Sequence, residues 1–170
     1  MMITRATIWF RMLLAVLLFC GAADADDPGR DQLGNLEVRV FFGTNGDAAV
    51  AGDQAVAVEK DVVEMLQAHE QVSFKSYRLL GNDTQPVYRS YENWAEPITG
   101  SDAVLCRFEV EKLVSAESLR LDLELWLRRK KILKSAVLLS EGKPMLVLGP
   151  EWRGGNFIIS VELTPKPEKK

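Results

Sequence analysis

The chain has 170 residues, of which 47% are hydrophobic and 26% are charged, and its formal net charge is −3 at pH 7. This mildly acidic balance argues against a nucleic-acid partner, which would require a dense positive surface. A chain of this length buries roughly two thirds of its surface on folding, so it is long enough for one domain with a substantial core.

The first 25 residues predict a secretory signal peptide. A basic start precedes nine consecutive apolar residues, "MLLAVLLFC" from Met12 to Cys20. That run is too short for a transmembrane helix, which needs about 20 residues. Phe19 stands where a lipoprotein signal requires a small residue, whereas a small-any-small pattern ends at Ala25. We therefore expect cleavage after Ala25 and an exported protein, periplasmic or extracellular, whose mature chain has no membrane span.

The mature chain has a net charge of about −4, because the leader removes two arginines and one aspartate. Cys106 is its only cysteine, which rules out an intramolecular disulfide. The polar stretch 26–35, "DDPGRDQLGN", is rich in residues that interrupt regular structure and predicts a linker. Stability must therefore come from packing of the residues that follow.

The next two segments predict a strand and a helix. "LEVRVFF" at 36–42 alternates apolar and charged residues with the period of a half-buried strand. A flexible loop then leads to a stretch with helical periodicity at 54–70. Five residues predict its apolar face: Val58, Val62, Met65, Leu66 and His69.

The rest of the chain reads as short strands separated by turns. The clearest is 119–128, where five leucines occupy alternate positions, as on one face of a strand. The tail at 164–170 is too polar to pack and is predicted to be disordered. The other predicted strands are 72–80, 85–91, 104–111, 132–140, 144–149 and 156–163, with turns that include 81–84, 141–144 and 150–155.

These elements predict a single mainly β (α+β) domain at 36–163. About eight short strands and one amphipathic helix suit a β-sandwich or a partly open barrel with the helix laid on one side.

The order strand, loop, helix, then "FKSYRLL" and the late segment "GKPMLVLGP" resembles a group of small uncharacterised exported bacterial proteins. The resemblance covers roughly 36–163. It implies an exported protein with a mainly β fold, and it implies no catalytic residue.

Few residues are candidates for chemistry. His69 and Cys106 are the only imidazole and thiol of the mature chain, but each falls on a predicted apolar face, so we expect both to be structural. Carboxylates are plentiful, and a glycosidase-like pair would be recognised only by its separation in space. We therefore expect no catalytic residue, no metal site and no cofactor.

The basic run from Arg128 to Lys131 lies between two predicted strands. A solvated hairpin turn is its simplest interpretation, and contact with an anionic envelope surface is the functional alternative.

Aromatic residues are the best candidates for a binding surface. Trp152 falls in the predicted turn "PEWRGG", and Arg153 follows it, so we expect an exposed anchor there. Trp126 lies on the polar face of the leucine strand, where either the helix or a neighbouring segment covers it or a partner contacts it.

The sequence thus favours a non-catalytic exported module that binds a protein or another envelope component. The alternatives are a small carboxylate-dependent hydrolase and a glycan-binding module that uses exposed aromatic residues. No nucleic-acid partner is expected.

Overall fold

The structure, a computed structural model, describes residues 27–95, 98–100 and 103–166, so the predicted signal peptide lies outside the described residues. No helix in this described part has the length and apolar character needed to cross a membrane. In chain order the elements are η1 (Pro28–Arg30), β1 (Gln32–Thr44), η2 (Ala48–Ala51), β2 (Val56–Ala57), α2 (Lys60–Gln67), η3 (Glu70–Val72), β3 (Ser76–Tyr88), β4 (Glu92–Ala95), β5 (Val104–Ser115), β6 (Ser118–Leu127), β7 (Lys130–Ser140), β8 (Met145–Trp152) and β9 (Gly155–Thr164).

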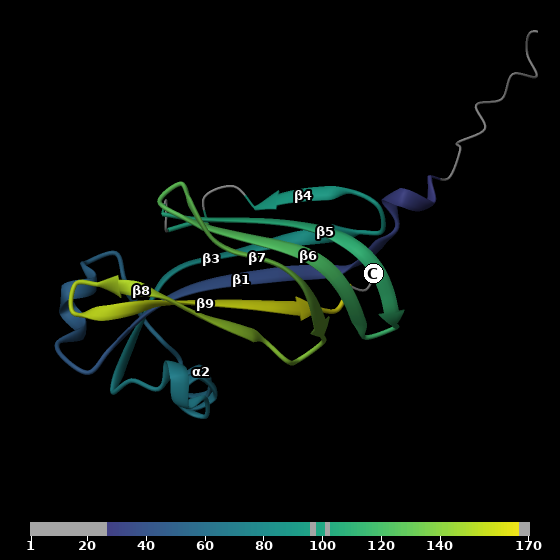
Figure 1. The fold of residues 1–170 in the computed structure, drawn as a ribbon. Helices are drawn as coiled ribbons and strands as arrows, with labels where there is room; N and C mark the ends of the chain where they lie inside the picture. Colours follow the sequence, from purple (N-terminus) through teal and green to yellow (C-terminus); the bar gives the residue numbers. More distant parts are fainter. Residues whose placement is uncertain (1–26, 96–97, 101–102, 167–170) are drawn as a thin grey trace, which may run out of the picture.

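The strands form two antiparallel sheets packed as a sandwich (Figure 1). The first sheet has the order β2-β3-β1-β9-β8, and the second has the order β4-β5-β6-β7. The chain passes from the first sheet to the second after β3 and returns after β7. The mainly β class with one α-helix is confirmed, and of the two predicted architectures the chain adopts the sandwich.

The main core lies between the two sheets. The five leucines of β6 are each at most 5% exposed, which confirms the face assigned to them from their alternation. They pack against the inward residues of β1 and β9, among them Val38 and Ile159. Cys106 belongs to this core and is fully buried.

A second, smaller core lies on the outer face of the first sheet, where α2 packs (Figure 1). Leu66 of the helix meets Phe41, Tyr77 and Ile158 there. This cover explains why the alternation of β1 ends in two consecutive phenylalanines: Phe41 faces the helix, and Phe42 faces the interior of the sandwich. Tyr77 also holds the segment after the helix, because its hydroxyl donates to the Val72 carbonyl at 2.9 Å.

The predicted linker and helix are both longer than the structure allows. Strand β1 begins at Gln32 and already pairs with β3 there, so the last residues of the predicted linker belong to the sheet. The helix begins at Lys60, because Val56 and Ala57 pair with β3 as β2. It ends at Gln67, two residues before His69.

The turn predicted at 81–84 is wrong. Asn82, Asp83 and Thr84 all pair with β1, and β3 runs through them as one strand. A register shift opposite Val40 absorbs the one extra residue as a β-bulge. Pairing with a long partner strand outweighs the local preference of these residues for a turn.

Candidate functional site

Two hairpins meet at one end of the sandwich, away from η1 and from the end of β9 (Figure 1). Each has a two-residue turn: Arg128–Arg129 joins β6 to β7, and Arg153–Gly154 joins β8 to β9. We call these turns and the residues around them the hairpin end. The basic run is therefore a hairpin turn as predicted, with Lys130 and Lys131 already in β7.

A recess of about 430 Å³ lies between the two hairpins. Its lining is apolar on the inside and mainly cationic at the rim. The residues that line it are Leu127, Arg128, Lys130, Ile132, Pro150, Glu151, Trp152 and Phe157. A second recess of about 270 Å³ shares Arg128, Trp152 and Phe157 with the first and extends toward Ala51 and Leu80.

The turns hold three arginines in left-handed backbone conformations. The φ angles of Arg128, Arg129 and Arg153 are 49°, 65° and 52°, and no other non-glycine residue in the described part of the chain has a positive φ. This conformation is unfavourable by about 1–2 kcal/mol for an ordinary L-residue, which is why asparagine and glycine dominate such turns. Strain of this kind concentrates at functional sites.

Trp152 makes more packing contacts than an exposed anchor in a turn would make. It is the last residue of β8, half-buried, and its ring stacks on Phe157 at 5.0 Å between centroids. Phe42 meets it edge-on at 5.6 Å. The Arg153 guanidinium lies 4.5 Å from the centroid of the same indole. Phe157 and Arg153 therefore cover the faces of the ring that a flat ligand would use.

Trp126 lies elsewhere, on the outer face of the second sheet. The helix does not cover it, because α2 packs on the other sheet. The Lys131 ammonium lies 4.7 Å from the centroid of its ring, and the side chain is half-buried. Its indole N–H is buried and makes no hydrogen bond within the described residues.

Beside Trp126, Glu124 is surrounded by cations. It is 5% exposed, and its carboxylate lies 2.9 Å from Lys131, 3.0 Å from Lys134 and 3.4 Å from Arg107. Hydrogen bonds from the two lysines hold the pKa of Glu124 at about 2. This carboxylate is thus ionised at every physiological pH and is unsuited to be a general acid.

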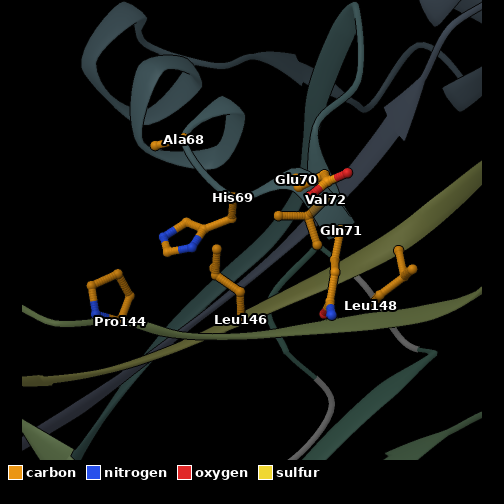
Figure 2. Close-up of a pocket in the computed structure, with 8 residues that line it drawn as sticks. All are labelled: Ala68, His69, Glu70, Gln71, Val72, Pro144, Leu146 and Leu148. Carbon is orange, nitrogen blue, oxygen red and sulfur yellow. The ribbon is translucent and has the colours of Figure 1, made fainter.

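His69 and Cys106 do not come together. His69 is exposed beyond the end of α2, so its predicted place on the apolar face of the helix is wrong. It lines a groove of about 410 Å³ on the outer side of the first sheet, where Figure 2 shows its ring beside Pro144 and Leu146. Cys106 lies on the other side of that sheet, inside the sandwich. Burial raises the pKa of its thiol to about 12.

The sequence alone does not reveal the recess. Its lining comes from two hairpins that are separated along the chain, and only the basic run and Trp152 were recognisable as candidates. No protein-family model, curated protein or solved structure matches this chain.

Proposed function

We propose that this protein is an exported, non-catalytic β-sandwich module that binds an anionic component of the cell envelope through its hairpin end. The observation that carries the proposal is the trio of arginines in left-handed conformations. Asparagine or glycine would relieve the strain at Arg128 and Arg129, so stability does not account for arginine at these two positions. A guanidinium offers a planar set of donors that matches carboxylate and phosphate groups.

The charges around these arginines also favour an anionic partner. Within the described residues, no carboxylate lies in ion-pair range of Arg128, Arg129 or Lys130. Elsewhere the cations near Glu124 and Glu162 are paired. A protein with a net charge of −3 thus places three consecutive cations without an ion-pair partner in the described part of the chain, Arg128, Arg129 and Lys130, at one end.

The two alternative functions receive less support. A hydrolase would need a carboxylate of raised pKa, whereas the buried Glu124 has a lowered one. A glycan-binding site built on stacking would need a free aromatic face, and Phe157 and Arg153 occupy the faces of Trp152.

A sedimentation assay with a bacterial envelope fraction tests the proposal. The wild-type protein is expected to sediment with the envelopes, less so as salt rises, and the R128N/R129N/R153N variant to stay in the supernatant. The matched control, K112N/R120N/K143N, removes the same charge from exposed positions outside the hairpin end and should sediment like wild type. Equal retention of both triple variants would contradict the proposal.

Export is tested separately by the intact mass of the protein recovered outside the cytoplasm. The expected mature chain begins at Asp26. A lipid-modified chain that begins at Cys20 would overturn the cleavage site and show that the protein is anchored to a membrane.

A further inference from the structure

We infer that the recess between the two hairpins binds an amphipathic anion: an aliphatic chain that carries one anionic head group. This inference rests on the proposed function and names the ligand class of the same site. It goes further in assigning a defined pocket rather than a charged surface.

The inside of the recess suits an aliphatic chain. Leu127 and Phe157 are buried core residues, so their side chains form an apolar floor, and the half-buried Ile132 and Trp152 form walls. Its volume of about 430 Å³ lies in the range of small-molecule sites. Apolar ligands gain free energy in proportion to the area they remove from water.

The rim of the recess selects the charge of the head group. Arg128 and Lys130 both line it, and Glu151 is the one acidic residue among its lining residues. The two cations outnumber the carboxylate, and neither has an ion-pair partner within the described residues. An anionic head group would provide that partner. Glu151 opposes binding of the anion and limits its affinity.

The walls of the recess are held in place before any ligand binds. The Arg128 N–H donates to the Ala103 carbonyl at 2.7 Å, which ties the first turn to the segment before β5. The Thr44 hydroxyl donates to the Gly154 carbonyl at 3.0 Å, and Arg153 donates to the Val50 carbonyl at 2.8 Å. These bonds fix the second turn. A preformed site loses less conformational entropy on binding.

Titration calorimetry with defined probes tests the inference on the purified mature protein. Decanoate has both the chain and the anionic head, decyl glucoside has the chain alone, acetate has the head alone, and decyltrimethylammonium has the opposite charge. Decanoate is expected to bind and the other three to bind at least roughly ten-fold more weakly. Decyl glucoside and decyltrimethylammonium cannot accept charge-assisted hydrogen bonds from the rim, and acetate has no chain to bury on the apolar floor. Equal binding of decanoate and decyl glucoside would contradict the inference that the rim binds the anionic head group. Equal binding of decanoate and acetate would contradict the inference that the apolar floor binds the chain.

Three substitutions locate the site. R128N should weaken decanoate binding roughly ten-fold while the melting temperature is kept or raised, because asparagine tolerates the left-handed conformation. E151Q should strengthen it by removing the opposing charge. The control R120N removes an equal charge from a strand position outside the recess and should bind decanoate like wild type.

The outcomes separate this inference from the proposed function. If decanoate fails to bind, or binds R128N and wild type equally, the inference is wrong. In that case retention on envelopes that still depends on the three arginines would leave the proposed function standing. Decanoate binding that requires Arg128, without arginine-dependent envelope retention, would support the pocket and contradict the envelope partner.

Discussion

Arg153 lies over the ring of Trp152, with 4.5 Å between its guanidinium carbon and the ring centroid, and donates a hydrogen bond to the Val50 carbonyl at 2.8 Å. One side chain therefore covers the tryptophan and ties the β8–β9 turn to the loop after β1. These contacts make Trp152 a packed residue whose edge lines the recess, and they leave Arg128 and Lys130 as the groups free to meet a ligand.

Replacing Trp152 by alanine should destabilise the domain by about 2–3 kcal/mol. The indole is half-buried and contacts two phenylalanines, and removal of a fully buried Trp side chain is unfavourable by about 3–5 kcal/mol. Trp152→Phe should lose much less stability, because it keeps an aromatic ring in contact with Phe42 and Phe157. Urea unfolding gives both values. Unchanged stability of the alanine variant would mean that Trp152 is the exposed anchor expected from the sequence.

Replacing Arg128 and Arg129 by asparagine should stabilise the domain by roughly 1 kcal/mol per position, since both residues have a positive φ. Arg153→Asn should give a smaller gain or none, because it removes the hydrogen bond to Val50 and the contact with Trp152. Thermal unfolding measures the stability of the three single variants relative to wild type. A loss of stability in R128N and R129N would show that the left-handed turn is not strained by arginine.

Cys106 should be inert in the folded protein. Its thiol is fully buried, and burial raises its pKa from 9.0 to about 12. A thiol reagent should label it slowly in the native state and rapidly in denaturant, since the thiolate is the reactive form. Rapid labelling of the native protein would instead indicate an accessible thiolate.

The raised pKa of Cys106 also predicts how stability depends on alkaline pH. Because the folded pKa is the higher one, the unfolded chain loses this proton first, and stability should fall between pH 9 and 12. Cys106→Ala should flatten that decline.

Glu124 should contribute stability that acid removes. Its pKa is lowered from 4.5 to about 2 by hydrogen bonds from Lys131 and Lys134, so the folded state keeps the charged form that the unfolded chain loses first. The contribution is complete above pH 4.5 and declines as the pH falls toward 2. Glu124→Gln should be less stable than wild type at neutral pH and equal to it below pH 2. Urea unfolding at several pH values measures the difference, and a difference that persists at the lowest pH would assign it to packing.

The sequence by itself determined the features that depend on local periodicity. The alternating leucines of 119–127 are buried, Cys106 shares the inward face of its strand, and Leu66 marks the apolar side of the helix, all as the pattern predicts. Side-chain direction along one strand or helix follows from the geometry of that element, so it can be inferred without knowing its neighbours.

Only the tertiary structure decided which segments meet. Strand β3 crosses a predicted turn because β1 pairs along its length, and Trp152 is covered because Phe42 and Phe157 come from other strands. The recess exists because Arg128 and Trp152 belong to hairpins of different sheets that end at the same side of the sandwich. Such contacts depend on strand order and sheet packing, which arise between residues distant in the chain and therefore leave no periodic signal in it.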